Sequence, residues 1–212
     1  MSSYAVPARK TQAEIRVSNS RFIAHLAPAA DVDAAKTFID DIRSQYADAT
    51  HNVPAYVIGH GASVTAHCND DGEPSGTAGR PVLAVLQGSG LGDLVVVVTR
   101  YFGGTKLGTG GLVRAYTQAA QAVLAVTPTA RRAPVHHVRI EMPYPLYEQA
   151  RNLIGQLGGE LVQEDFAGQV TVEARLLSKR FDELQEGLTE LSRGRVAVEV
   201  LGVDESAIWP GA

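Results

Sequence analysis

The chain has 212 residues, of which 45% are hydrophobic, and a formal net charge of −4 at pH 7. This length allows a substantial core, either in one large domain or in two small ones. The negative charge argues against a protein that binds nucleic acid with its whole surface, so any such contact has to be local. Residues 1–130 carry ten basic and ten acidic side chains, whereas residues 131–212 carry nine and thirteen. The acidity therefore belongs to the second half of the chain.

The cysteine count and the apolar runs restrict the class of protein further. Cys68 is the only cysteine, which rules out an internal disulfide, a cysteine-rich zinc site and a CxxC redox pair. No segment reaches the roughly 18 uncharged apolar residues that span a bilayer, and no apolar run follows the basic residues of the N-terminus. We therefore expect a cytoplasmic protein without a membrane partner.

Patterns of alternating and helical periodicity predict an α/β domain in the first half of the chain. Asn19 is a turn former between two alternating segments, Asp31 has the character of a helix cap, and four successive valines from Val95 indicate a central strand buried on both faces. The expected strands are 13–18, 21–26, 52–59, 62–68 and 93–102, and the expected helices are 33–46, 79–88 and 109–126.

The segment 128–137 combines prolines, arginines and small residues, and we predict that it is a linker. Beyond it, the expected order is strand, helix, two strands joined by a hairpin, helix and strand. The β-α-β-β-α-β order is that of a ferredoxin-like fold. The expected elements of this half are 135–142, 145–157, 160–166, 169–177, 178–194 and 195–202.

Two glycine-rich loops at 70–81 and 100–116 stand out, because 11 of the 21 glycines lie between Gly72 and Gly111. Glycine is needed where φ is positive or where a partner approaches the backbone closely, and glycine-rich loops can point several N–H groups at one place. The second loop follows a strand and opens a helix, whose N-terminus attracts anions. The alternative is that these glycines only permit a tight turn and close packing.

The charges and donors of the two loops define a candidate anion site. Lys106 and Arg100 add positive charge to the second loop, and Arg114 lies on the same side of the helix that follows. The stretch from Ser75 to Arg80 resembles a second set of phosphate-facing donors. The predicted anion-binding or nucleic-acid-binding residues are Ser75, Thr77, Arg80, Arg100, Gly104, Thr105, Lys106, Gly108, Thr109, Gly110, Gly111 and Arg114.

Carboxylates and histidines give weaker indications of catalysis. Asp70, Asp71 and Glu73 could bind Mg²⁺ or act as a general base, but in a turn they more often cap local amides and pair with cations, here Arg80, Arg100 or Lys106. His51 is the histidine best placed to face the loops, and for every histidine we favour a hydrogen-bonded structural imidazole. Asp71, Glu73 and His51 are the candidate catalytic residues. The sequence contains no Walker A motif, no HExxH and no GxSxG elbow, and we predict no metal site and no cofactor.

Four segments, SRFIAHL, DATHNVPAYVIG, DDGEPSGTAGRPVL and VVVVTRYFGGTKLGTGGLVRAY, closely resemble the YigZ/IMPACT family. The resemblance implies an α/β (α+β) protein with two domains. Residues 1–130 would form an IMPACT-type domain like domain 2 of ribosomal protein S5, and residues 135–203 a ferredoxin-like domain like one in elongation factor G. Residues 204–212 would form a tail.

The resemblance also indicates a connection with translation. Both domain types occur in proteins that work on RNA or the ribosome, and eukaryotic IMPACT proteins are implicated in restraining a translation-initiation kinase. Those proteins carry an additional N-terminal domain, so their role does not transfer directly.

Three functions follow as hypotheses. The first is a protein that binds RNA, a nucleotide or another phosphate-bearing ligand at the glycine loops, in contact with the ribosome or a translation factor. The second is a phosphoester or acyl hydrolase that uses Asp71 or Glu73 and the glycine amides. The third is a protein-interaction module that acts on translation and in which the glycines are structural.

Overall fold

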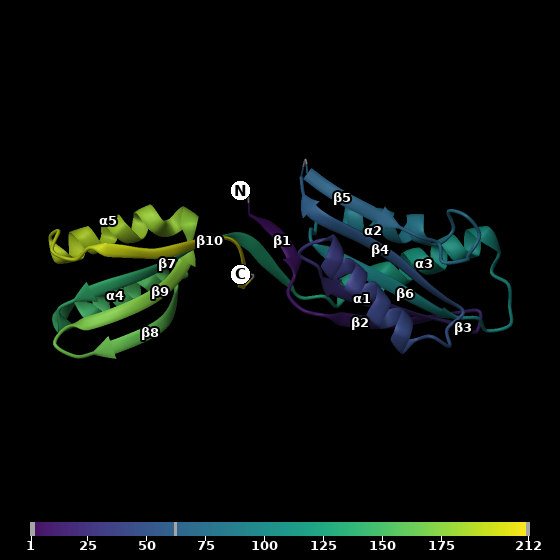
Figure 1. Cartoon of the computed structure of the whole chain (residues 1–212), viewed down its shortest axis with the longest axis horizontal. Helices are drawn as coiled ribbons and strands as arrows, with labels where there is room; N and C mark the ends of the chain where they lie inside the picture. The colour runs from purple at the N-terminus through teal and green to yellow at the C-terminus, as the bar shows by residue number, and fades with distance from the viewer. Residues whose placement is uncertain (1–2, 62, 211–212) are drawn as a thin grey trace. The chain divides into compact units, whose positions relative to one another are not determined.

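The computed structural model describes residues 3–61 and 63–210, which divide into two units after Ala130. The N-terminal unit comprises Tyr4–Ala130 with Pro210, and the C-terminal unit comprises Arg131–Trp209 with Ser3. Each unit combines helices with an antiparallel sheet, so the α/β (α+β) class is confirmed (Figure 1). Within the described residues, no helix is both long and apolar enough to cross a bilayer.

A tight turn starts the sheet of the N-terminal unit. Strand β2 (Thr11–Val17) pairs with β3 (Ser20–Pro28) in a register that places Val17 opposite Ser20. The two residues between them, Ser18 and Asn19, have φ values of 46° and 68°. Asparagine tolerates this left-handed conformation, which two-residue hairpins require, so the predicted hairpin is confirmed.

Five antiparallel strands form this sheet in the order β2-β3-β6-β4-β5. Strand β6 (Leu94–Tyr101) is central and buried along Leu94–Arg100, as its run of valines predicts. Its neighbours are β3 and β4 (His51–His60), and β5 (Ser63–Cys68) forms the far edge. Ala62, in the expected strand 62–68, lies outside the described residues. A short strand, β1 (Tyr4–Pro7), precedes the hairpin.

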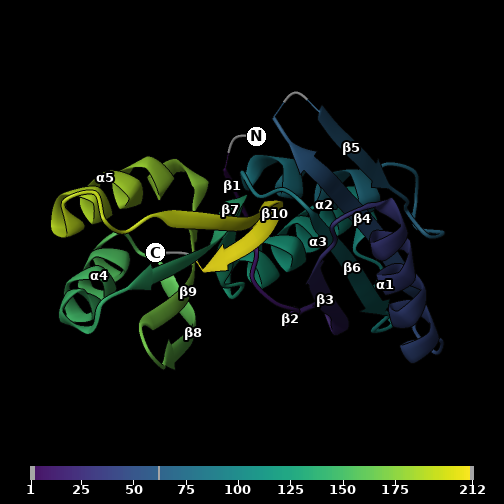
Figure 2. The same cartoon turned by 60° about the vertical axis from the view of Figure 1, so that its left-hand side comes forward.

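Helices cover the two faces of this sheet unequally (Figures 1 and 2). On one face, α1 (Val32–Gln45) packs alone, with Phe38 and Ile39 against Val95 and Val97. The predicted cap is confirmed, because the Asp31 side chain accepts a hydrogen bond from the Ala34 amide at 2.8 Å. The other face carries two helices, α2 (Gly79–Gly88) and α3 (Gly108–Ala125), around a larger core.

The C-terminal unit has the predicted ferredoxin-like order. Its elements are β7 (Thr129–Met142), α4 (Tyr144–Gln156), β8 (Glu160–Phe166), β9 (Val170–Leu177), a 3₁₀ turn η1 (Ser178–Arg180), α5 (Phe181–Ser192) and β10 (Val198–Pro210). Strand β7 pairs with both β9 and β10, and β8 pairs with β9. Apolar side chains from β7 and β9, including Ile140 and Val172, pack against Ile154 of α4 and Leu184 of α5.

Two segments of this half differ from expectation. The predicted linker 128–137 belongs almost entirely to β7, in which Ala130 and Ala133 are buried, Arg131 is exposed and Arg132 is half-buried. Composition alone had suggested an irregular segment. The last strand, β10, continues to Pro210, so the described part of the expected tail 204–212 is strand. Residues 211–212 lie outside the described residues.

The structure shows the expected hydrogen bonds for His51 and His136, but not for His25 on β3. The residue is 4% exposed, and its Nε2 atom has no hydrogen-bond partner among the described residues. Burial lowers the pKa of the imidazole to about 4, because removing a charged ring from water is unfavourable. The ring is therefore neutral near pH 7.

The buried neutral His25 predicts a loss of stability in acid. The unfolded chain, with an imidazole pKa near 6.5, takes up the proton first, so this contribution is complete above pH 6.5 and is lost as the pH falls towards 4. The loss from this group is about 3 kcal/mol at most. Urea unfolding at pH 7, 5.5 and 4.5 should show a steeper decline for the wild type than for His25→Phe. Lys10 and Asp41 line the same pocket and Tyr46 packs against the ring at position 25, and all three are present in both proteins. Equally steep declines in the two proteins would therefore contradict the assignment of this acid sensitivity to His25.

Candidate functional site

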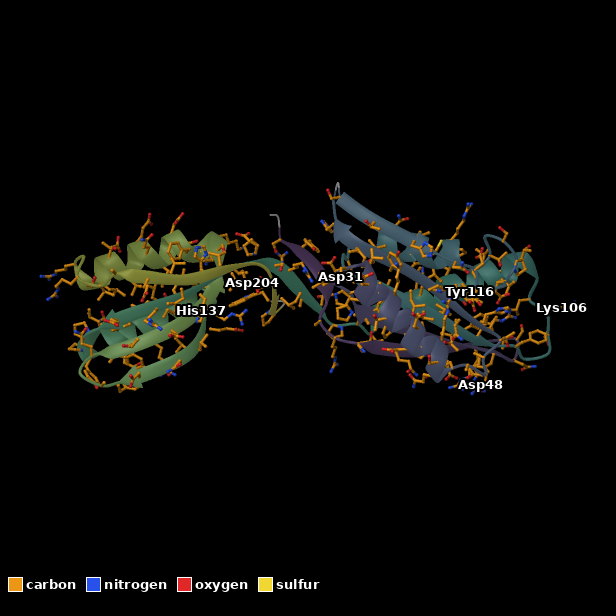
Figure 3. The ribbon with its side chains drawn as sticks, viewed as in Figure 1. Asp31, Asp48, Lys106, Tyr116, His137 and Asp204 are labelled. Atoms are coloured by element: carbon orange, nitrogen blue, oxygen red, sulfur yellow. The ribbon has the colours of Figure 1, made fainter. Side chains whose placement is uncertain are left out.

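The second glycine loop connects the end of β6 to the start of α3, as predicted. Lys106 and Thr105 are exposed on this loop, and Figure 3 shows Lys106 ahead of the helix. A Cβ atom added to Gly104 or Gly108 would meet no atom within 4 Å, so the space over this backbone is open. Both glycines have positive φ values, 86° and 67°, which explains their identity independently of any ligand.

The N-terminus of α3 is open to solvent and uncapped. Leu107 occupies the cap position and makes no side-chain hydrogen bond to the helix. The next residues, Thr109 and Gly110, are exposed. The Nη1 atom of Arg114 lies 3.7 Å from the position that a Cβ of Gly110 would take, so this guanidinium lies over the first helical turn. Unpaired amides and a cation thus converge at one point.

The first glycine loop is arranged differently, because its amides already have an anionic partner. The carboxylate of Asp70 accepts hydrogen bonds from the amides of Gly76, Ala78 and Gly79 at 2.8, 3.1 and 2.8 Å. Burial alone raises the pKa of this carboxyl, but the three amides and Arg80 outweigh burial and hold the pKa below its usual value. Asp70 therefore caps α2, as expected for a carboxylate in a turn.

This cap corrects the expectation of phosphate-facing donors between Ser75 and Arg80. The amides of Gly76, Ala78 and Gly79 are bound to Asp70, and the buried hydroxyl of Thr77 donates to the Pro74 carbonyl at 2.6 Å. Ser75 and Arg80 remain exposed.

A buried polar network lies beneath the loops. Glu73, 8% exposed, accepts hydrogen bonds from Arg100 at 2.5 Å and from the Tyr116 hydroxyl at 2.8 Å. Burial and the adjacent Glu73 raise the pKa of Tyr116 far above its ordinary value. Since Arg100 is itself only 5% exposed, its charge serves the network rather than the open surface of the second loop.

His51 joins the network to the neighbouring carboxylate. Its Nδ1 atom donates to the backbone carbonyl of Asp71 at 2.6 Å, and its Nε2 atom lies 3.8 Å from Glu73. The Asp71 carboxylate accepts a hydrogen bond from the backbone amide of Asn52 at 2.6 Å and forms an ion pair with Arg43. The three candidate catalytic residues are therefore neighbours, and each is held by structural partners. Within the described residues, no group of three or more His, Cys, Asp or Glu side chains could hold a metal ion.

Sequence reasoning did not identify Tyr116, Asn52 and Arg43 as members of this arrangement. Tyr116 lies 43 residues from Glu73, and Arg43 lies 28 residues from Asp71. Each looks locally like an ordinary helix or strand residue. The available signals were the places of Tyr116 and Asn52 in the quoted segments 95–116 and 48–59.

Comparisons with known proteins agree with this architecture. Residues 18–124 match the family described as Impact N-terminal domain, and residues 140–195 match a domain of unknown function, DUF1949. The IMPACT family member YigZ of Escherichia coli K12 is 36% identical over 206 residues, covering 97% of this chain and all of the relative. The chain belongs to the IMPACT family.

Two further comparisons extend over most of the chain. The family member YvyE of Bacillus subtilis 168 is 37% identical over 193 residues, which cover 91% of this chain and 88% of that protein. A crystal structure of a hypothetical protein aligns with 35% identity and a TM-score of 0.63, covering 95% of this chain and 98% of the other. The two-domain fold therefore belongs to relatives that match almost from end to end.

The glycines of this IMPACT-family protein separate into a packing group and an open group. A Cβ on Gly103 would lie 2.1 Å from the Asn19 backbone, and one on Gly79 would lie 2.7 Å from the Asn69 carbonyl oxygen. These two positions fit the interpretation that glycine only permits close packing. Gly104 and Gly108 face open space instead.

We expect Gly103→Ala to destabilise the protein by about 3 kcal/mol or more, because a methyl group cannot share space with the backbone of the β2–β3 turn. Gly110→Ala is the matched control in the same region, since its methyl would lie 3.7 Å from the flexible end of Arg114. Chemical unfolding measures both variants. Equal stability of the two would contradict the packing role of Gly103.

A double-mutant cycle tests the buried ion pair. Arg100→Met should cost about 3–5 kcal/mol, because it leaves the Glu73 carboxylate buried without its cation. Adding Glu73→Gln removes that charge, so the double variant should be more stable than Arg100→Met alone. Unfolding free energies from urea titrations at pH 7 measure the coupling. Costs that simply add would show that the two residues act independently.

Proposed function

We propose that the protein binds RNA or another phosphate-bearing ligand at the N-terminus of α3 and acts in the regulation of translation. The observation that carries this proposal is the uncapped first turn of α3, open to solvent and accompanied by exposed Lys106 and Arg114. Helix N-termini bind anions through free amides and the helix dipole. The predicted cytoplasmic location belongs to the same proposal.

The contrast with α2 strengthens this assignment. The two helices lie on the same face of the sheet and both follow glycine-rich loops. At α2 the chain supplies its own carboxylate, Asp70, which binds three amides. The α3 terminus has no such cap from Leu107. A phosphate oxygen would occupy there the position that the Asp70 oxygens occupy at α2.

The proposed surface is smaller than the set expected from sequence. Arg100 and Thr77 are buried and hydrogen-bonded within the protein, so we leave them out of direct ligand contact. Ser75 and Arg80 remain as exposed groups beside α2. The proposed contacts at α3 are Gly104, Thr105, Lys106, Gly108, Thr109, Gly110, Gly111 and Arg114.

The connection with translation rests on family resemblance. The likeness to a ribosomal protein domain and to eukaryotic IMPACT proteins supports a ribosome or translation factor as the setting. The hydrolase hypothesis has less support, because Glu73 is in an ion pair with Arg100. The Asp71 carboxylate is likewise bound to the backbone amide of Asn52 and to Arg43. A general base needs an oxygen that is free to take a substrate proton.

Binding of a fluorescent 15-nucleotide single-stranded RNA, followed by anisotropy from 25 to 200 mM salt, tests the proposal. The Lys106→Ala/Arg114→Ala variant should bind about tenfold or more weakly. Its slope of log affinity against log salt should be shallower by about 1.4, the value for two lost phosphate contacts to a single strand. Inorganic pyrophosphate, used as a competitor, distinguishes general phosphate binding from a requirement for RNA.

A charge-matched control is Arg16→Ala/Lys36→Ala, which also removes two cations. Arg16 lies on the edge strand β2 and Lys36 on α1, across the sheet from α3. The control should retain wild-type affinity. An equal loss in both double variants, or no RNA binding even at 25 mM salt, would sink the proposal. Protein partners that survive nuclease treatment would favour the interaction-module hypothesis instead.

A further inference from the structure

The face of the sheet opposite α2 and α3 carries only one helix. A helix is roughly 10 Å wide and neighbouring strands lie about 4.8 Å apart, so one helix cannot cover five strands. In the N-terminal unit, α1 packs over the middle strands, with Phe38, Ile39 and Ile42 against β6. Residues of β2 and β3 line a strip beside α1 on this face.

A pocket of about 370 Å³ occupies this strip. Its walls include His25 of β3, Gln12 of β2, and Phe38, Asp41 and Ile42 of α1. This volume lies within the usual range of small-molecule sites, which combine an apolar wall with a few polar groups. The pocket lies on the face of the sheet opposite the α3 terminus, so it is separate from the proposed phosphate site.

His25 is the polar group of the pocket that most needs an explanation. Its residue is 4% exposed and Nε2 has no hydrogen-bond partner in the described part of the chain. The Tyr46 ring packs against it with centroids 4.7 Å apart, a contact between rings rather than a hydrogen bond. A buried polar atom without a partner costs stability. A phenylalanine at this position would avoid that cost.

The remaining walls indicate the kind of ligand. Phe38 and Ile42 supply an apolar surface, and the Lys10 ammonium lies 5.4 Å from the centroid of the Phe38 ring. Lys10 and Asp41 contribute one charge of each sign, and the imidazole is neutral near pH 7. The pocket therefore has no excess charge that would favour an anion or a cation.

We infer that this pocket binds a small neutral molecule with a flat apolar body, whose hydroxyl or amide group hydrogen-bonds to Nε2 of His25. The apolar body packs against Phe38 and Ile42. The ligand thus supplies the hydrogen bond that His25 lacks within the protein.

Simple aromatic probes test this site directly. Benzamide and benzyl alcohol carry the required groups, ethylbenzene lacks them, and benzoate and benzylamine add charge. Long-range ¹H–¹⁵N spectra of the full chain at pH 7 report on the His25 ring nitrogens during titration up to 10 mM. Benzamide or benzyl alcohol should shift these resonances and should bind about tenfold or more tightly than ethylbenzene, the factor expected for pairing one buried polar group.

Two variants distinguish a specific hydrogen bond at His25 from nonspecific binding of aromatic molecules. His25→Phe keeps the size and removes the ring nitrogens, so it should abolish the preference for benzamide over ethylbenzene. His67→Phe, on the exposed edge strand β5, should retain that preference. The proposal is overturned if no neutral polar probe shifts the His25 nitrogens, if benzoate or benzylamine binds as tightly as benzamide, or if His25→Phe keeps the preference. The wild-type spectra decide the matter even if His25→Phe does not fold.

Discussion

The buried contact between Glu73 and Arg100 holds together the parts of the N-terminal unit from which the candidate site is built. Glu73 comes from the first glycine loop, Arg100 from the end of the central strand and Tyr116 from α3. One carboxylate therefore joins a loop, a strand and a helix at the point where both glycine loops begin. Because burying these charges is favourable only when they are paired, the pair restricts where the loops can lie.

This arrangement explains why two similar glycine loops have different surfaces. The first loop turns back on itself, and its Asp70 carboxylate accepts hydrogen bonds from the amides of Gly76, Ala78 and Gly79 at the start of α2. The second loop leaves β6 next to the fixed Arg100 and reaches α3 without placing a carboxylate at the helix terminus. In both cases a helix N-terminus follows a glycine-rich loop. The α2 terminus is capped by a carboxylate of the chain, whereas the α3 terminus is open to solvent.

Local patterns were sufficient for most of the fold and for the position of the second loop. Asn19 predicted the hairpin, Asp31 the start of α1 and the valines of β6 the centre of the sheet, because each depends on neighbours in sequence. The pairing of a loop carboxylate with Arg100 was expected and is found at Glu73, but the contact with Tyr116, 43 residues away, could not be predicted from local patterns. The prediction of a linker at 128–137 was wrong for a related reason. A segment with small residues such as Ala130 and Ala133 forms a strand only by pairing with segments that are distant in the sequence.

The unequal covering of the sheet connects the two proposed sites to one architectural fact. Two helices on one face bury a large core, and the N-terminus of one of them, α3, is open to solvent, where its charge can be used. On the other face a single helix borders a pocket with β2 and β3, and the neutral imidazole there has no partner for Nε2 among the described residues. An apolar residue at position 25 would close that face at lower cost. The presence of a histidine there is explained by a ligand that completes its hydrogen bonding.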